Sequence, residues 1–209
     1  MEKGILVVVS GFSGVGKGTL MHELLRNYDN YALSISATTR SPREGEVDGR
    51  EYFFKTMEEF DSMIANDELI EYARYVDNYY GTPKAYVESQ LEAGKDVILE
   101  IETMGASKIK SKYPEALLIF VAPPSAEELK NRLVKRGTED MACIDSRMRK
   151  AVEESEGIEN YDYLVINDDL DTCVKEMHSL IRREYNSISR KKDFIRRIQS
   201  ELKESWKGE

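Results

Sequence analysis

Glycines and one lysine near the N-terminus form the pattern with the clearest chemical meaning in this sequence. Lys17 ends a Gly-x-x-x-x-Gly-Lys motif that follows an unbroken apolar run and precedes a helix-like stretch. Glycines let backbone N–H groups turn inward around an anion, and the N-terminus of the next helix adds positive charge there. The motif therefore predicts a phosphate-binding loop between a buried strand and a helix. Its residues are Gly11, Phe12, Ser13, Gly14, Val15, Gly16, Lys17, Gly18 and Thr19.

Two alternative structures for this loop fit the residues less well. A glycine-rich turn that merely contains a lysine would not need both the strand-like run before it and the helix-like residues after it. A dinucleotide-binding turn needs a further glycine three residues after Gly16, and Thr19 occupies that position.

The residue after the lysine departs from the usual pattern. A Ser or Thr there normally offers its hydroxyl to Mg²⁺, but this chain has Gly18, with Thr19 one position later. Two arrangements stay open. Either the metal is held mostly through water and a carboxylate from another strand, or Thr19 reaches it.

Length and composition narrow the class of protein. The 209 residues suit one α/β domain with an inserted lobe, and the net charge of −9 argues against nucleic acid as a partner. No apolar stretch is long enough to span a bilayer, and the first apolar run is too short for a signal peptide. We therefore expect a cytoplasmic protein with no membrane partner.

The cysteines and histidines suggest neither a disulfide nor a zinc site. Cys143 and Cys173 stand far apart, as expected for reduced thiols. His22 and His178 both lie in helix-like segments, where structural or surface roles are expected.

Strand-like and helix-like segments alternate along most of the chain, which indicates an open parallel sheet. Strands are expected at residues 31–36, 96–102, 116–121 and 163–166. Residues 37–82 break the alternation. There, a turn-rich segment, a short strand at 51–54, a capping box from Thr56 to Glu59 and strand-like residues 69–76 indicate an inserted lobe. A helix is expected to begin at Pro83, with Thr82 as its cap.

The inserted segment contains a series of residues that matches a known family. The stretch Ser34-Ile-Ser36-Ala-Thr-Thr-Arg40-Ser-Pro-Arg43-x-Gly45-Glu46-x-x-Gly49-x-x-Tyr52 resembles the acceptor lobe of guanylate kinases. Glu71 and the run Asn78-Tyr-Tyr-Gly-Thr82 fit as well, as do Arg136-Gly-Thr138 and Val165-Ile-Asn167. The resemblance covers residues 4–184.

The resemblance implies a three-layer P-loop fold with a central parallel sheet, an inserted lobe of a small sheet plus a helix, and a helical lid. The core would comprise residues 1–36 and 83–209, with the lid at 136–148 and a final helix at 189–206. The acceptor lobe would comprise residues 37–82. The implied reaction is ATP-dependent phosphorylation of GMP, and of dGMP, by direct in-line transfer with Mg²⁺.

The resemblance also assigns roles to individual residues, and each role makes chemical sense. Guanidinium and phenol groups suit a phosphate dianion because each hydrogen bond is charge-assisted. A carboxylate can accept from both N1–H and N2–H₂ of guanine, which adenine cannot satisfy. The residues expected to bind the GMP phosphate are Arg40, Arg43, Tyr52 and Tyr80, and those expected at the base are Ser36, Glu71, Thr82 and Glu102.

On the ATP side, the resemblance implies that Asn167 contacts the adenine edge. The metal would be held by Thr19 or by Glu100, which lies at the carboxyl end of a core strand, in part through water. Glu102 is longer than the Asp that often stands at its position in the family. The residues expected to act in catalysis are Lys17, Arg132, Arg136 and Arg147.

The tail has a different character from the rest of the chain. Residues 185–209 carry seven basic and four acidic groups on an otherwise acidic protein. Ile195, Ile198, Leu202 and Trp206 form one helical stripe. We expect this helix to pack back on the domain, and a seam between two copies is the alternative. The protein would be a monomer or a homodimer.

Two other functions share features with this sequence. Guanylate-kinase-like domains also serve as non-catalytic adaptors, but these generally lose the lysine or glycines of the phosphate loop, which this chain keeps. Adenylate kinase shares a Gly-Lys-Gly-Thr run, yet its acceptor lobe does not resemble this one.

Overall fold

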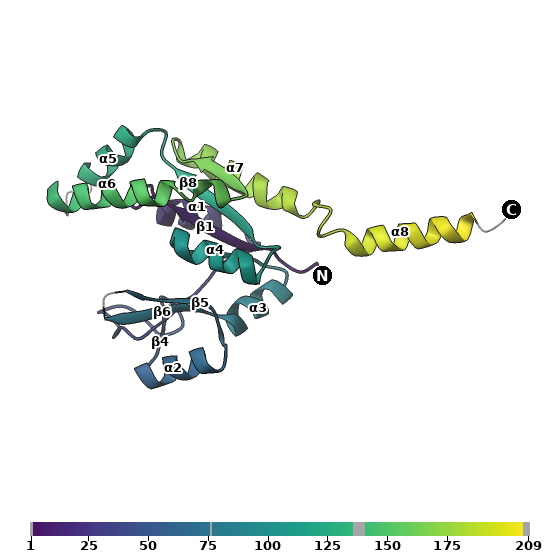
Figure 1. Ribbon diagram of the computed structural model, residues 1–209, viewed down its shortest axis with the longest axis horizontal. Helices are drawn as coiled ribbons and strands as arrows, with labels where there is room; N and C mark the ends of the chain where they lie inside the picture. The colour runs from purple at the N-terminus through teal and green to yellow at the C-terminus, as the bar shows by residue number, and fades with distance from the viewer. Residues whose placement is uncertain (1, 76, 136–140, 207–209) are drawn as a thin grey trace.

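The computed structural model describes residues 2–75, 77–135 and 141–206. Its main sheet contains five parallel strands in the order β2-β7-β1-β8-β9. Figure 1 labels two of them, β1 and β8. The bounds of the five strands are β1 Leu6–Gly11, β2 Tyr31–Leu33, β7 Asp96–Glu100, β8 Leu117–Ala122 and β9 Tyr163–Ile166. The parallel sheet predicted from the alternating pattern is confirmed.

Helices cover both faces of this sheet and complete three layers. Alternate side chains of β1 separate into two cores, since Val7 and Val9 join one cluster while Leu6 and Val8 join the other. The first cluster receives α1 Lys17–Asn27, α5 Ala126–Lys135, α6 Met141–Ser155 and α7 Leu170–Glu184. The second receives α3 Lys84–Glu92 and α4 Thr103–Lys112. A short 3₁₀ helix, Ile158–Asn160, precedes β9.

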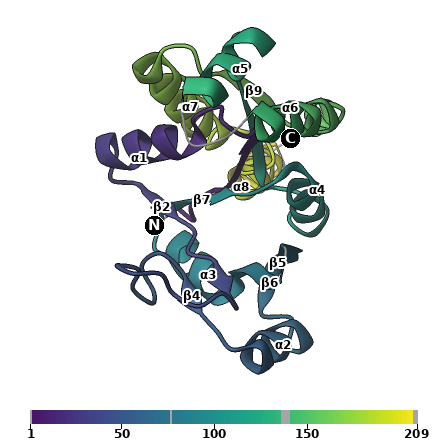
Figure 2. The same cartoon turned by 90° about the vertical axis from the view of Figure 1, so that its left-hand side faces the viewer.

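A second sheet lies beside the core and comes from the region that broke the alternation (Figure 2). Its order is β4-β3-β6-β5, and only the β3–β4 pair is parallel. The strands are β3 Ala37–Thr38, β4 Phe53–Phe54, β5 Leu69–Tyr75 and β6 Asn78–Pro83. Phe60 of α2 Met57–Ala65 packs with Ala37 and Leu69 in a small separate core. The predicted capping box is present at the start of α2.

One helix start differs from the sequence prediction. Thr82 does not cap α3, because it lies inside β6 and its hydroxyl donates to Glu71. Pro83 is the N-cap residue instead of the first helical residue, and α3 begins at Lys84. The hydroxyl is thereby directed toward a carboxylate of the neighbouring strand instead of toward the helix backbone.

The tail helix also differs from the preferred prediction. Residues 192–205 form α8, but no residue of this helix is buried, and it extends away from the domain (Figure 1). The expectation that it packs back on the domain was therefore wrong. The preceding segment is tied to the N-terminus, where Arg190 donates to the Lys3 carbonyl and Lys191 pairs with Glu2. Among the described residues, no helix combines the length and the apolar content that crossing a bilayer requires.

Candidate active site

The predicted phosphate loop runs from the carboxyl end of β1 to the first turn of α1. Gly14 and Gly16 have φ values of 90° and 96°, which residues with side chains rarely adopt. A Cβ on Gly14 would lie 2.5 Å from Leu133 Cδ2, and one on Gly16 would lie 2.9 Å from Asn167 Nδ2. These two glycines are therefore required by both conformation and packing.

The ammonium of Lys17 lies inside the loop. Its Nζ donates to the carbonyls of Gly11 at 2.7 Å and Phe12 at 3.2 Å. Burial lowers the pKa of Lys17, and the charges of Glu100, Glu154 and Glu102 oppose this effect. The nearby carboxylates thus favour the charged form of Lys17, the form that can bind an anion.

Residues far along the sequence converge on this loop. Arg132 of α5 donates from Nη1 to the Val15 carbonyl at 3.2 Å, and Asn167 after β9 donates to the same oxygen at 2.8 Å. Arg147 of α6 donates from Nη1 to Ser13 Oγ at 2.7 Å. Three of the residues predicted on the ATP side are therefore gathered at one place. Arg136 lies outside the described residues.

Glu154 is a residue of this site that the sequence pattern did not reveal. It is only 9% exposed, its Oε2 has no hydrogen-bond partner among the described residues, and it lies near the Ser13 backbone N–H and Lys17. Burial raises its pKa. Because Glu154 lies seven residues after Arg147, both side chains occupy one face of α6. That spacing was the available signal, but a glutamate on an amphipathic helix normally indicates a solvated face.

A second group of predicted residues meets in the lobe. Nη2 of Arg40 donates to both carboxylate oxygens of Glu46, at 2.8 and 2.9 Å, and the guanidinium lies 5.3 Å from the centre of the Tyr52 ring. Tyr80 is adjacent, with its ring centroid 6.0 Å from that of Tyr52. Hydrogen bonding to Glu46 raises the pKa of Arg40. Glu46 also accepts from the backbone N–H of Arg43, whose side chain is exposed.

The residues predicted at the base divide into two groups. Glu71 accepts a 2.8 Å hydrogen bond from the buried Thr82 hydroxyl, and burial raises the pKa of Glu71. Glu102 lies elsewhere, after β7, and forms a 2.8 Å ion pair with Lys150 of α6. The structure thus brings Glu71 and Thr82 together, whereas Glu102 is joined to the helix that carries Arg147.

A cavity of about 380 Å³ lies between the lobe and the core. Tyr52 and Thr82 line it from the lobe, Ser36 from the segment that leads into the lobe, and Leu99 and Glu100 from β7. A volume of this order suits a small-molecule ligand. Residues of both predicted sites therefore share one cavity.

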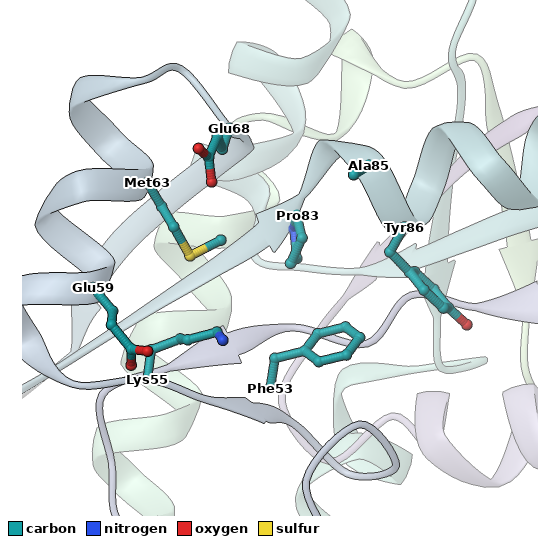
Figure 3. Close-up of a pocket in the computed structure, with 8 residues that line it drawn as sticks. All are labelled: Phe53, Lys55, Glu59, Met63, Glu68, Pro83, Ala85 and Tyr86. Carbon is teal, nitrogen blue, oxygen red and sulfur yellow. The ribbon is translucent and has the colours of Figure 1, made fainter.

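Another cavity, of about 330 Å³, contains no predicted site residue (Figure 3). Phe53 lines it, and Phe53 follows Tyr52 directly in the chain, so the two side chains leave the strand on opposite faces. Met63 of α2 and Tyr86 of α3 also line this cavity, together with Lys55, Glu59, Glu68, Pro83 and Ala85. Its position on the other face separates it from the group around Arg40.

The residues predicted to hold a metal are compatible with Mg²⁺ but would leave most of its coordination to other ligands. Thr19 and Glu100 are both exposed, and no cluster of three His, Cys, Asp or Glu side chains suited to a metal occurs among the described residues. Mg²⁺ characteristically keeps several waters and binds through one or two carboxylates plus substrate phosphates. One carboxylate beside a phosphate loop fits that preference.

Comparisons of the sequence and of the structure with known proteins agree on one family. The family model described as Guanylate kinase matches residues 3–184. A guanylate kinase from Clostridioides difficile (strain 630) is 53% identical over 195 residues, covering 93% of this chain and 95% of its own length. One from Bacillus subtilis (strain 168) is 52% identical, with 88% and 91% covered. The crystal structure of guanylate kinase from Anaplasma phagocytophilum matches with a TM-score of 0.70 and 31% identity, covering 90% of each chain.

Proposed function

The chain belongs to the guanylate kinase family, which phosphorylates GMP with ATP, and from that premise we propose how its own residues divide the work. The γ-phosphoryl group passes from ATP directly to a phosphate oxygen of GMP, which yields ADP and GDP. No covalent enzyme intermediate is required. Catalysis then consists mainly of positioning two polyanions and neutralising their charge.

The donor side is built on the phosphate loop. Backbone N–H groups of residues 11–19 bind the ATP phosphates, and Lys17 turns from the Gly11 carbonyl, 2.7 Å away, to the outer phosphates. Arg132 and Arg147 already point at this loop and stabilise the transferring group. Asn167 contacts the adenine edge. Arg136 contributes a further guanidinium in this proposal.

The acceptor side is built on side chains of the lobe. Arg40, Tyr52 and Tyr80 form the phosphate site, to which Arg43 adds a second guanidinium fork. Glu46 holds Arg40 in place through both carboxylate oxygens.

Guanine is recognised by Glu71 and Thr82, with Ser36 and Glu102 as further contacts. The Glu71 carboxylate accepts from N1–H and N2–H₂, while the Thr82 hydroxyl keeps it oriented. Because these contacts involve the base and the phosphate and leave the ribose 2′-hydroxyl untouched, we expect dGMP to be accepted as well.

The observation that supports this assignment best is the cavity between the lobe and the core. Its lining combines Ser36, Tyr52 and Thr82 with Glu100 at the end of a core strand. Ligands of open parallel sheets bind at that end of the strands. An acceptor in the cavity would thus lie at the edge of the sheet from which the donor loop also leaves.

Mg²⁺ is the cofactor that this site is expected to need. When bound, it would neutralise charge that develops during transfer. Glu100 would hold it in part through water, and Thr19 supplies the hydroxyl that Gly18 lacks. We also place the protein in the cytoplasm, since Cys143 and Cys173 are not joined in a disulfide.

A coupled assay tests the substrate assignment. The purified chain is given ATP, Mg²⁺ and one of GMP, dGMP, AMP, UMP or CMP, and ADP release is followed. Turnover is expected with GMP and dGMP and not with the other three acceptors. Equal turnover with AMP would overturn the base assignment, and no turnover with any acceptor would favour the adaptor function.

A further inference from the structure

One face of α6 contacts both the donor loop and a residue expected at the acceptor base. Arg147, Lys150 and Glu154 follow one another at spacings of three and four residues, so their side chains share one face of the helix. Arg147 Nη1 donates to Ser13 Oγ of the phosphate loop at 2.7 Å, whereas Lys150 Nζ lies 2.8 Å from Glu102 Oε1. Lys150 is therefore the side chain through which this face of α6 reaches the acceptor side.

The first turn of α4 brings Glu102 close to the other carboxylate expected at the base. Glu102 is the N-cap residue of α4, and its carbonyl accepts from the Gly105 N–H at 2.9 Å. A Cβ on Gly105 would lie 3.9 Å from Glu71 Oε2, so Glu71 lies directly beside this turn. Figure 2 shows α4 between α6 and β5, the strand that carries Glu71. The Lys150–Glu102 pair thus lies at the edge of the proposed base site.

Guanine offers donors for two carboxylates. The two oxygens of Glu71 accept from N1–H and from one N–H of the 2-amino group in the proposed base contact. The second N–H of that amino group then needs another acceptor, and Glu102 is the remaining carboxylate expected at the base. A long, exposed glutamate loses conformational freedom when it is ordered, so a contact from Glu102 costs entropy unless its side chain is already held.

Lys150 provides the contact that holds the Glu102 carboxylate. Within residues 2–75, 77–135 and 141–206, no other side chain pairs with Glu102. The Lys150 ammonium lies 2.8 Å from Glu102 Oε1 and 4.0 Å from Glu154 Oε1. Burial raises the pKa of Glu154, Lys150 lowers it and Glu102 raises it, so the three charges interact. Without Lys150, the Glu102 carboxylate would be repelled by Glu154 and would have no fixed position.

The exposure of this ion pair separates a role in binding from a role in folding. The side chains of Lys150 and Glu102 are 43% and 65% exposed, and exposed ion pairs add little to stability. A carboxylate that is already oriented before the nucleotide arrives nevertheless lowers the entropy cost of binding. Loss of the pair should therefore affect the acceptor and leave folding unchanged.

We propose that Lys150 is a positioning residue for the acceptor, which holds the Glu102 carboxylate ready to accept from the 2-amino group of guanine. This inference rests on the proposed function, in which Glu102 contacts the base. Lys150 acts through Glu102 and does not touch the nucleotide itself. It therefore contributes to the binding of GMP and not to the transfer step.

Steady-state kinetics and thermal unfolding of the full chain test the role of Lys150. Lys150→Met should raise KM for GMP by about 10-fold, with kcat, KM for ATP and the melting temperature unchanged. Lys150→Arg, which can still pair with Glu102, should retain the wild-type KM. Arg149→Met removes the same charge from an exposed neighbour on α6 and should also resemble the wild type. An unchanged KM for GMP in Lys150→Met, or a loss confined to kcat or to KM for ATP, would overturn the proposal.

Glu102→Ala distinguishes failure of this inference from failure of the proposed base contact. It should raise KM for GMP at least as much as Lys150→Met does, and the double variant should match Glu102→Ala alone, because Lys150 acts through Glu102. The inhibition constant of inosine monophosphate, which lacks the 2-amino group, should be the same in the wild type and in all these variants. A raised KM in Glu102→Ala beside an unchanged KM in Lys150→Met, or additive effects in the double variant, would overturn the role of Lys150 alone. A wild-type KM in Glu102→Ala would overturn the base contact of Glu102 and, with it, the role of Lys150.

Discussion

In our proposal, the phosphate loop and the acceptor lobe bind anions by different means. In the loop, the shape is set by consecutive residues, with two glycines at φ values of 90° and 96° and Lys17 bonded to carbonyls only five and six residues away. In the lobe, the site is assembled from side chains that come from separate strands, such as Arg40, Tyr52 and Tyr80. The loop is therefore specified locally, whereas the lobe depends on the packing of a small sheet.

This difference predicts how a substitution in each site affects activity and folding. Loss of the Lys17 side chain should remove chemistry and leave the fold intact, because the backbone still forms the loop. Loss of one lobe residue should act mainly on the acceptor. The following substitutions test this contrast, from the largest expected effect to the smallest.

Lys17→Ala should lower kcat by about 10³-fold or more, because no other side chain can bring a cation to the outer phosphates from inside the loop. The melting temperature should stay close to that of the wild type. Lys130→Ala, on the exposed face of α5, is the matched control and should keep full activity. A mild loss of kcat in Lys17→Ala would mean that the loop is not the phosphate site.

Arg40→Ala should lower kcat/KM for GMP by about 10²-fold, because a charge-assisted contact to the acceptor phosphate is removed. KM for ATP should change little. Arg50→Ala removes an exposed arginine of the same segment that pairs with Glu51, and it should resemble the wild type. Equal changes in the two KM values would contradict the assignment of Arg40 to the acceptor.

Glu71→Gln should reduce the preference for GMP over AMP by about 10²-fold, because the neutral amide can donate to N1 of adenine. The pH dependence should change as well. Burial raises the pKa of Glu71, so the carboxylate that accepts from guanine is lost as the pH falls through this raised value. As the pH is lowered, the GMP affinity of the wild type should therefore begin to fall at a higher pH than it would if residue 71 had the pKa of an ordinary glutamate.

Steady-state kinetics with GMP and with AMP, repeated between neutral and acid pH, measure the change in base preference and the change in pH dependence. The variant should lack the acid-side loss of GMP affinity that depends on residue 71. Unchanged selectivity together with an unchanged pH profile would remove Glu71 from the base site.

Glu154→Gln should lower kcat/KM for ATP by about 10-fold, since the buried carboxylate lies near the Ser13 backbone N–H and the Lys17 ammonium. KM for GMP should remain the same. Glu153→Gln alters the exposed neighbour on α6 and serves as the control. If both variants behave like the wild type, Glu154 has no part in shaping the loop.

Gly18→Ser should have the smallest effect. A Cβ at Gly18 would meet no atom within 4 Å, so the serine fits without strain. The free energy of unfolding should shift by about 0.5 kcal/mol or less. Titration of activity with Mg²⁺ should show a requirement equal to or lower than that of the wild type, and a much weaker response to Mg²⁺ would contradict a metal position near residues 18 and 19.

Much of the fold could be predicted because its patterns are local. The buried run of β1, the capping box of α2 and the strand at 163–166 all depend on neighbours in the sequence, and each is present. The predicted cap at Thr82 was wrong, because a Thr before Pro suits both a helix cap and a strand end. Only the position of Glu71 on the neighbouring strand decides between them.

The tail helix shows what the periodicity of apolar residues cannot predict. The stripe of α8 correctly predicted an amphipathic helix, but periodicity does not say what lies beneath the apolar face. Glu154 shows the same limit, because its spacing from Arg147 places it on a face without revealing that this face is buried against the loop.

The sequence alone determined the phosphate loop, the alternation of strands and helices and the resemblance that names the family, because backbone conformation and residue spacing are properties of adjacent residues. The tertiary structure decided which distant groups meet. It placed Asn167 and Arg132 on the Val15 carbonyl, paired Glu102 with Lys150 and left α8 uncovered. Such contacts depend on how separate elements pack, and no local pattern encodes that packing.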